Sequence, residues 1–135
     1  MPELQRTFVM VKPDGVSRGL VGEVVRRIEA KGYTIVEMKL FTIDEKLART
    51  HYSEHEDKPF FADLVSFITS GPVVAMVVQG PDAVPGMRQV MGATDPLQAV
   101  PGSLRGDFAT EITQNIVHGS DSPESASREV GLFFG

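Results

Sequence analysis

Cysteine is absent from this sequence of 135 residues, and so is tryptophan. The fold therefore cannot rely on disulfide bonds, which fits a protein of a reducing compartment. No apolar run approaches the roughly 18 residues of a membrane-spanning helix. The N-terminus also lacks the basic segment followed by an apolar run that marks a signal peptide. We therefore expect a cytoplasmic protein without a membrane anchor.

Positive charge is also scarce, because 13 lysine and arginine residues stand against 18 aspartate and glutamate residues, for a net charge of −5. An acidic protein has no general attraction to nucleic acids or anionic membranes, so nucleic-acid binding is not expected as its main role. A polyphosphate ligand would need a local cluster of cations. The hydrophobic share of 41% and the chain length are those of one soluble domain, which we expect to span residues 1–135.

The spacing of apolar residues predicts the order of strands and helices. Strands are predicted by alternation and short β-branched runs, and helices by apolar residues three or four apart beside capping residues. The predicted strands cover residues 7–12, 33–41, 73–78 and 116–117, and the predicted helices cover 20–31, 44–51, 60–68, a segment from about 84, and 122–130. Their core order, βαββαβ, predicts an α+β fold of the ferredoxin-like kind, with helices packed on an antiparallel sheet.

Three local features add detail to this prediction. In the second predicted strand, Val36, Met38 and Leu40 share one parity and are expected to face the core. The third predicted strand is apolar on both faces and should be central. From Gly92 to about Thr110 no periodic pattern is present, and so long an irregular loop before the last strand is usually functional.

His118 is the main candidate for catalysis, because imidazole is a side chain that can act as a neutral nucleophile near pH 7. It follows a short apolar run and precedes Gly119, which lets another group approach the backbone closely. Ser120 and Asp121 add a hydroxyl and a carboxylate. A helix predicted to begin at Ser122 would favour a phosphate near the histidine and disfavour the imidazolium form. The alternative is a histidine that merely ends a strand.

Four residues could bind the charged oxygens of a transferring phosphoryl group, which is stabilised by lysine and arginine. Lys12 ends the first predicted strand, Arg88 lies on a predicted helix, and Thr94 and Arg105 lie in the long loop. No glycine-rich P-loop is present, so the phosphates are not held in that manner. The alternative for each residue alone is an ordinary surface position.

Two further groups have open interpretations. Phe60 and Phe61 cannot easily point to the same core, so one of them could stack on a nucleobase, while the alternative places both in the core. His51 and His55 are four residues apart and could face the same way as metal ligands. No third ligand is evident beside them, so we favour the interpretation without a metal.

The motifs that carry these residues resemble those of nucleoside diphosphate kinases over nearly the whole chain, from Thr7 to Phe134. The chain ends without the longer C-terminal tail of animal members, which is similar to short bacterial ones. The matching blocks are Val11–Val16, His51–His55, Lys58–Phe61, Ser70–Val73, Gly92–Pro96, Arg105–Phe108 and Asn115–Asp121.

The resemblance implies a ping-pong reaction that balances nucleoside triphosphate pools, including deoxynucleotides, with broad tolerance of base and sugar. A nucleoside triphosphate gives its γ-phosphoryl group to His118, and a nucleoside diphosphate then takes it. Which ring nitrogen of His118 carries the group stays open, with the pros nitrogen as the candidate. The resemblance further implies a homohexamer, with a homotetramer as the alternative.

The resemblance also implies roles for residues around His118. Magnesium would be bound by the nucleotide phosphates and water rather than by the protein directly, with Glu54 and Asp121 as possible contacts through water. The implied phosphate and ribose contacts are Lys12, Tyr52, Arg88, Thr94, Arg105 and Asn115; the implied base contacts are Phe60, Leu64 and Ile112; and the implied supports of His118 are Ser120 and Glu129.

Three points remain open at this stage. A catalytically silent nucleotide-binding domain would have the same fold, although no residue of the implied site is substituted. Pro85 and Gly86 stand where the family usually continues a regular helix toward Arg88, which leaves the start of that helix uncertain. As a loop residue, Arg105 is expected to contribute to charge stabilisation and little to packing.

Overall fold

The structure is a computed structural model that describes residues 4–135. Its sheet has four strands in the order β2-β3-β1-β4, and all neighbouring pairs are antiparallel. This arrangement confirms the prediction of a ferredoxin-like α+β fold. The strands are β1 (Leu4–Val11), β2 (Thr34–Thr42), β3 (Pro72–Pro81) and β4 (Val117–Gly119).

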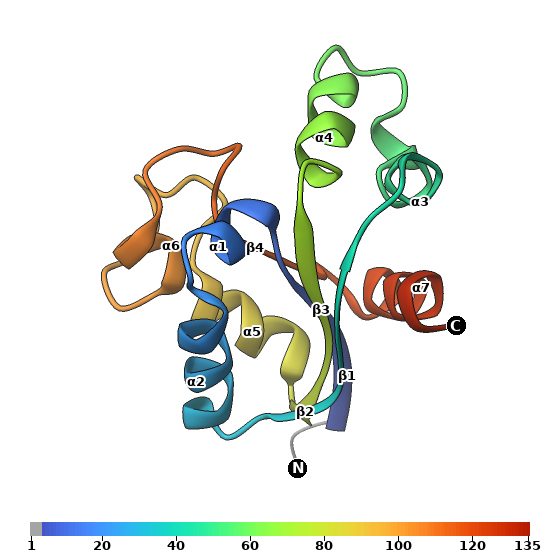
Figure 1. The fold of residues 1–135 in the computed structure, drawn as a ribbon. Helices are drawn as coiled ribbons and strands as arrows, with labels where there is room; N and C mark the ends of the chain where they lie inside the picture. Colours follow the sequence, from blue (N-terminus) through green and yellow to red (C-terminus); the bar gives the residue numbers. More distant parts are fainter. Residues whose placement is uncertain (1–3) are drawn as a thin grey trace.

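Helices cover both faces of this sheet (Figure 1). One apolar cluster lies between the sheet and α2 and α5, and a second lies between the sheet and α3, α4 and α7. Among residues 4–135, no helix is both long and apolar enough to cross a membrane. The helices are α1 (Pro13–Ser17), α2 (Val21–Lys31), α3 (Glu45–His51), α4 (Phe61–Ile68), α5 (Ala83–Met91), α6 (Leu104–Phe108) and α7 (Pro123–Phe134), with a 3-10 turn η1 (Ser53–His55).

The two central strands place the site at the end of β1. Along β1, Val9 and Val11 contribute to the cluster under α2 and α5, whereas Phe8 and Met10 contribute to the opposite cluster. All four side chains are fully buried, and each such burial stabilises the fold by about 1.5–3 kcal/mol. Lys12 follows directly, so its backbone is fixed by a strand that is buried on both faces. The prediction that β3 is central is confirmed as well.

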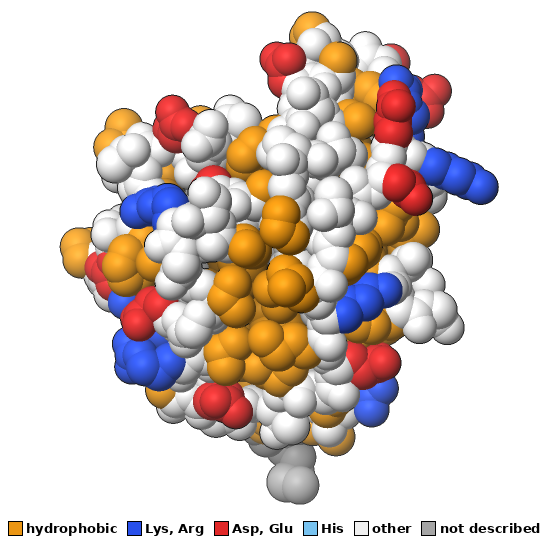
Figure 2. All heavy atoms as spheres, in the orientation of Figure 1, with side chains coloured by type: hydrophobic (Ala, Val, Ile, Leu, Met, Phe, Trp, Pro, Cys, Tyr) orange, Lys and Arg blue, Asp and Glu red, His pale blue; other side chains and the backbone are white. Residues whose placement is uncertain are grey.

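Val36 is only partly buried, and Met38 and Leu40 lie on the predicted face of β2 but outside the core. They pair with Met76 and Val74 of β3, so they point to the same side as those core residues. However, β2 is an edge strand, and its side chains there are not covered: Met38 is 49% and Leu40 67% exposed. An irregularity between Ile35 and Glu37 also breaks the simple alternation. Figure 2 shows the hydrophobic side chains gathered on this face, between α2 and the edge of the sheet.

Several predicted boundaries change in the structure. The turn predicted after Lys12 is the short helix α1, and the loop predicted from Gly92 to about Thr110 contains α6. The Ser103 hydroxyl caps α6 by accepting a hydrogen bond from the Gly106 amide at 3.1 Å. His118 lies within β4 rather than after it, because its backbone pairs with Met10. Helix α7 continues to Phe134 instead of ending near residue 130.

Pro85 and Gly86 fit a regular helix. Since α5 begins at Ala83, Pro85 is its third residue, where a backbone N–H has no partner within the helix. The Tyr33 ring packs directly on Gly86, and a Cβ atom there would lie 1.7 Å from the Tyr33 hydroxyl oxygen. That hydroxyl donates to the Pro81 carbonyl at 3.1 Å. The glycine is therefore needed for close packing, and α5 still carries Arg88 on a regular turn.

Candidate active site

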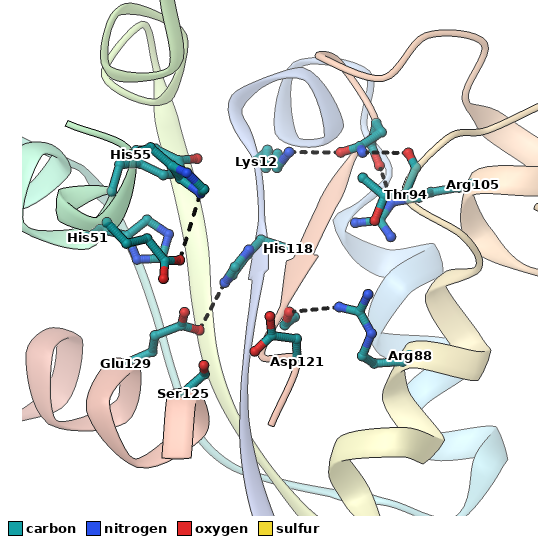
Figure 3. A pocket seen from close by; sticks show the side chains of 14 residues that line it. Lys12, His51, His55, Arg88, Thr94, Arg105, His118, Asp121, Ser125 and Glu129 are labelled. Carbon is teal, nitrogen blue, oxygen red and sulfur yellow. Dashed lines mark hydrogen bonds and ion pairs between the residues drawn. The ribbon is translucent and has the colours of Figure 1, made fainter. Parts of the chain in front are cut away.

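A cavity of about 280 Å³ opens where β1, β4, α5 and α6 face the α3–η1 segment. Figure 3 shows its side chains pointing inward from segments that are far apart in the sequence. The lining residues are Lys12, His51, Tyr52, Glu54, His55, Arg88, Thr94, Arg105, Asn115, His118, Gly119, Asp121, Ser125 and Glu129. The structure thus brings most of the residues predicted from the sequence to one place.

His118 is held through one ring nitrogen. Its Nε2 lies 2.9 Å from Oε1 of Glu129, which projects from α7, and the Ser120 hydroxyl donates to the same oxygen at 2.8 Å. Burial raises the pKa of Glu129, but the hydrogen bonds from His118 and Ser120 outweigh this and hold the pKa below its usual value. An ionised carboxylate only accepts, so Nε2 carries the proton. The lone pair of neutral His118 is therefore on Nδ1.

Helix α7 positions Glu129 because it begins at a strong cap. The Ser122 hydroxyl accepts a hydrogen bond from the Ser125 amide at 3.0 Å, and Pro123 occupies the first turn. This is the helix start predicted from the sequence. From that cap, the second turn of α7 places the Glu129 carboxylate beside the ring of His118.

Lys12 belongs to a chain of hydrogen bonds along one wall of the cavity. Its Nζ donates to Asn115 Oδ1 at 2.8 Å, and Asn115 Nδ2 donates to the Thr94 carbonyl at 3.0 Å. Burial, followed by the charge of Arg105, lowers the pKa of Lys12 to about 8 against the opposing effect of Asp14. An anion bound beside Lys12 would relieve this repulsion, so the ammonium group is suited to phosphate.

Arg105 is a structural residue as well as a charge, contrary to the expectation that it adds little to packing. Only 4% of it is exposed. Its guanidinium donates to the carbonyls of Asn115 at 3.3 Å, Gly92 at 2.9 Å and Val117 at 2.6 Å. Burial, and then the charge of Arg88, lowers its pKa to about 10. Arg105 therefore joins the long loop to β4 and stays cationic at neutral pH.

Arg88 completes the cationic wall from α5. Its Nη1 donates to the Gly119 carbonyl at 3.4 Å, which keeps the guanidinium next to the strand that bears His118. In Figure 3, Arg88 and Arg105 lie on one side of His118, His51 and Glu129 lie on the other, and Lys12 lies above His118. The cavity thus has a cationic side suited to phosphate and a second side of histidine and carboxylate.

The opposite wall comes from the end of α3. Arg128 of α7 holds it in place by donating from Nη2 to the Thr50 carbonyl at 2.6 Å and to the His51 carbonyl and Ser53 hydroxyl at 3.3 Å. Tyr52 follows on this wall, and burial together with the charge of Glu129 raises its pKa to about 12. Its hydroxyl therefore stays protonated and can donate a hydrogen bond to a ligand.

The remaining predicted residues are divided between the cavity and the surface around it. Glu54 and Asp121 line the cavity, whereas Phe60, Leu64 and Ile112 do not. Phe60 is 45% exposed while Phe61 is buried, so the alternative that places both in the core is excluded. Ile112 is exposed and Leu64 is partly buried. The structure therefore leaves the predicted base contacts outside the cavity.

Four residues of this cavity were not among the predicted site residues: His51, His55, Gly119 and Ser125. His51 was weighed only with His55, but its ring packs against that of His118, with centroids 4.9 Å apart. No local pattern could reveal this contact, because α3 and β4 are distant in the sequence. Gly119 and Ser125, in contrast, could have been included from their closeness to His118 and to the cap of α7.

Buried His51 makes stability depend on pH. Burial, and then the charge of His118, lowers its pKa from 6.5 to about 3, so the unfolded chain binds a proton that the folded chain does not. The contribution of neutral, buried His51 to the free energy of unfolding is therefore complete above pH 6.5. It is lost as the pH falls through 6.5 toward 3. We expect the free energy of unfolding to fall by about 1.4 kcal/mol per pH unit below that value.

Urea unfolding of the wild type and of His51→Phe and His55→Phe checks this between about pH 6.5 and 5, above the range in which most carboxylates titrate. The His51→Phe variant should lose most of the dependence of its free energy of unfolding on pH, and the His55→Phe variant should keep it. Equal slopes in all three proteins would contradict the prediction.

Comparison with known proteins places this geometry in a family. A family model described as nucleoside diphosphate kinase matches residues 5–135. The nucleoside diphosphate kinase of Parafrankia sp. (strain EAN1pec) is 65% identical over 130 residues, which are 96% of this chain and 95% of that protein. The one from Archaeoglobus fulgidus is 59% identical over 97% of this chain and 87% of that protein.

Solved structures of nucleoside diphosphate kinases have the same fold as this chain. A halophilic nucleoside diphosphate kinase from Halobacterium salinarum, in complex with CDP, has a TM-score of 0.94 at 57% identity, over 99% of this chain and 88% of that one. A nucleoside diphosphate kinase family protein from Babesia bovis has a TM-score of 0.94 at 46% identity, over 96% and 88% of the two chains. The chain therefore belongs to the nucleoside diphosphate kinase family.

Proposed function

We propose that the protein moves the γ-phosphoryl group of a nucleoside triphosphate to a nucleoside diphosphate through a phosphohistidine at Nδ1, the pros nitrogen, of His118. Family membership makes the chain a transferase that acts on nucleotides. The observation that carries the finer proposal is the bond from His118 Nε2 to Glu129 at 2.9 Å. It leaves Nδ1 as the nucleophilic atom of a ring that lines a cavity with three cations.

The first half-reaction forms a bond between Nδ1 and the γ-phosphorus and breaks the bond from that phosphorus to the bridging oxygen, which leaves with the nucleoside diphosphate. Lys12, Arg88 and Arg105 stabilise the charge on the transferring group and on the leaving phosphate. Glu129 stabilises the positive charge that develops on the ring. The second half-reaction is the reverse, with another nucleoside diphosphate as acceptor.

Tyr52, Thr94 and Asn115 would hold the phosphates and the ribose 3′-hydroxyl. Tyr52 offers a protonated hydroxyl, and Asn115 already bonds to Lys12 and to the backbone of Thr94. Their hydrogen-bonding groups read phosphate and sugar rather than a base edge. Such contacts support broad tolerance of bases and of deoxynucleotides, and hence a role in balancing nucleoside triphosphate pools.

The exposed ring of Phe60 would stack on the base, with Leu64 and Ile112 beside it. The Lys58 ammonium lies 5.8 Å from the centroid of this ring, and the His55 ring lies 5.7 Å away, so both neighbours help to position it. Stacking is tolerant of sequence because every base presents a π-face. The three residues lie outside the cavity, which fits a base that stays near solvent.

Magnesium would bind with the nucleotide, where it neutralises charge on the β- and γ-phosphates. The residues present fit this arrangement, because Glu54 and Asp121 are exposed carboxylates on the rim of the cavity. Magnesium keeps several waters, so exposed carboxylates suit contacts through water. No direct protein ligand for magnesium is proposed.

The partners of the protein would be nucleoside triphosphates, nucleoside diphosphates and further copies of itself. The uncovered Met38 and Leu40 on the edge strand β2 support self-association, because an open strand edge with apolar side chains favours pairing. A homohexamer is proposed, with a homotetramer as the alternative. Location in the cytoplasm, where free nucleotides are exchanged, stays a prediction from the proposed substrates.

A pulse-chase experiment tests the proposed function. The protein is incubated with γ-labelled ATP and magnesium and should acquire an acid-labile, alkali-stable label, whose nitrogen is identified by phosphorus NMR. Unlabelled GDP should then release the label as GTP. No label is expected on His118→Ala. Absence of label on the wild type, or equal labelling of the variant, would favour a silent nucleotide-binding domain.

A further inference from the structure

His51 is a buried histidine that the proposed mechanism does not use. Only 4% of it is exposed, and neither ring nitrogen has a hydrogen-bond partner among residues 4–135. Its ring is surrounded by the aromatic rings of Tyr52, Phe133 and Phe8, with centroids 4.6, 5.3 and 6.4 Å away. A buried polar atom without a partner costs roughly 1–3 kcal/mol, so such a residue calls for an explanation.

The imidazole of His51 lies against the two groups at the centre of the cavity. Its ring meets that of His118 edge-on at 85°, and one potential ligand atom from each of His51, His118 and Glu129 lies within 4.8 Å of the others. In Figure 3 these three side chains come from different elements and point toward one another, on the side of the cavity away from Arg88 and Arg105. Arg88 and Arg105 therefore lie apart from this cluster, whereas the charges of Lys12 and Arg128 still act on His51.

Two imidazoles and one carboxylate are the ligands that zinc and similar transition metals prefer. Ligand atoms around tetrahedral zinc lie about 3.4 Å apart, so closing from the present separations requires movements on the order of 1 Å. Magnesium prefers oxygen ligands only and would not compete here. Because all three residues line the cavity, water can fill the fourth position.

We propose that His51, His118 and Glu129 form a site for zinc or a similar divalent transition metal, and that metal binding here excludes phosphorylation of His118. The second half rests on the proposed function of His118. A metal on this cluster takes the imidazole of His118 and the carboxylate of Glu129 away from catalysis. It also places a dication beside the nucleophile, so the protein is either metal-bound or phosphorylated.

Cobalt(II) is the probe for the site itself, because four-coordinate cobalt absorbs visible light far more strongly than the hydrated ion. Metal-free protein titrated with cobalt chloride should develop these bands at one equivalent, and zinc chloride should remove them. The His51→Phe variant, which keeps an aromatic ring in the aromatic surroundings, should bind cobalt at least about 100-fold more weakly. The matched control His55→Phe should bind like the wild type.

A measurement on the wild type covers the case in which His51→Phe does not fold. The chain has three histidines, so imidazole nitrogen NMR resolves each of them. Zinc should shift the resonances of His51 and His118 and leave those of His55 unchanged. Weak octahedral bands only, shifts confined to His55, or unchanged affinity in folded His51→Phe would each overturn the site.

The inhibitory half is tested by the same labelling with ATP in the presence of zinc. Phosphohistidine should form on metal-free protein with magnesium and should be lost as zinc fills the site. If labelling is normal without zinc and cobalt does not bind, only this inference fails. If cobalt binds but metal-free protein never becomes labelled, the proposed phosphotransfer fails and the metal site stands. Full labelling of zinc-loaded protein would overturn the exclusion.

Discussion

Replacing Arg105 with alanine is expected to lower the free energy of unfolding by about 3–5 kcal/mol and to slow phosphoryl transfer by about 1000-fold. The stability effect arises because the carbonyls of Gly92 and Val117 lose this donor at once, and the Asn115 carbonyl keeps the Val117 amide but loses Arg105. The rate effect arises because one of three cations is removed from the transferring phosphoryl group.

Urea unfolding and single-turnover phosphorylation measure the two effects. Arg26→Ala is the matched control, since its side chain is 64% exposed and, within residues 4–135, pairs only with Glu23 of its own helix. Exposed pairs of this kind contribute roughly 0–1 kcal/mol. If Arg105→Ala unfolds at the same urea concentration as Arg26→Ala, the carbonyl contacts are not the source of stability.

Replacing Glu129 with glutamine is expected to slow formation of phosphohistidine by roughly 100- to 1000-fold with little change in shape. Glutamine can still reach His118 and Ser120, but its amide lacks the negative charge that stabilises the ring as positive charge develops. It can also present an N–H to Nε2, which would move the ring proton to Nδ1 and remove the nucleophilic lone pair.

Stopped-flow measurement of phosphorylation with ATP provides the rate, and circular dichroism checks the fold. Glu124→Gln serves as the control, because it removes an exposed carboxylate from the first turn of the same helix, and Glu124 does not line the cavity. The Glu124→Gln rate should match the wild type. A Glu129→Gln rate within about threefold of the wild type would mean that hydrogen-bond geometry, rather than charge, is what Glu129 provides.

Most elements of the fold were predictable because their patterns are local. Helix α2 ends at Gly32, Asp44 caps α3 and Ser122 caps α7, so these three helices lie close to the ranges predicted from the sequence. Whether a strand face is covered is different, since Met38 and Leu40 point to the predicted face yet stay largely exposed in the described part of the chain. Helix α6 was missed because its five residues depend on a cap and on nearby tertiary contacts rather than on periodicity.

The site was predictable residue by residue but not as an arrangement. His118 and its neighbours could be recognised from local sequence, whereas the meeting of Lys12, Arg88 and Arg105 depends on how the sheet and loop pack. Only the family resemblance predicted that these three side chains lie close together. Neither source indicated the contact of His51 with His118, because it is made through the aromatic cluster between α3, β1 and α7.

The hydrogen bonds of the cationic wall have a consequence for the entropy of nucleotide binding. Lys12, Asn115 and Arg105 already have fixed partners before any phosphate arrives. Immobilising such a side chain on binding would cost about 0.5–1.5 kcal/mol, and here that ordering is complete once the chain has folded. The unfavourable entropy of binding should therefore come from the exposed Phe60 side, where a base and a free ring still have to become ordered.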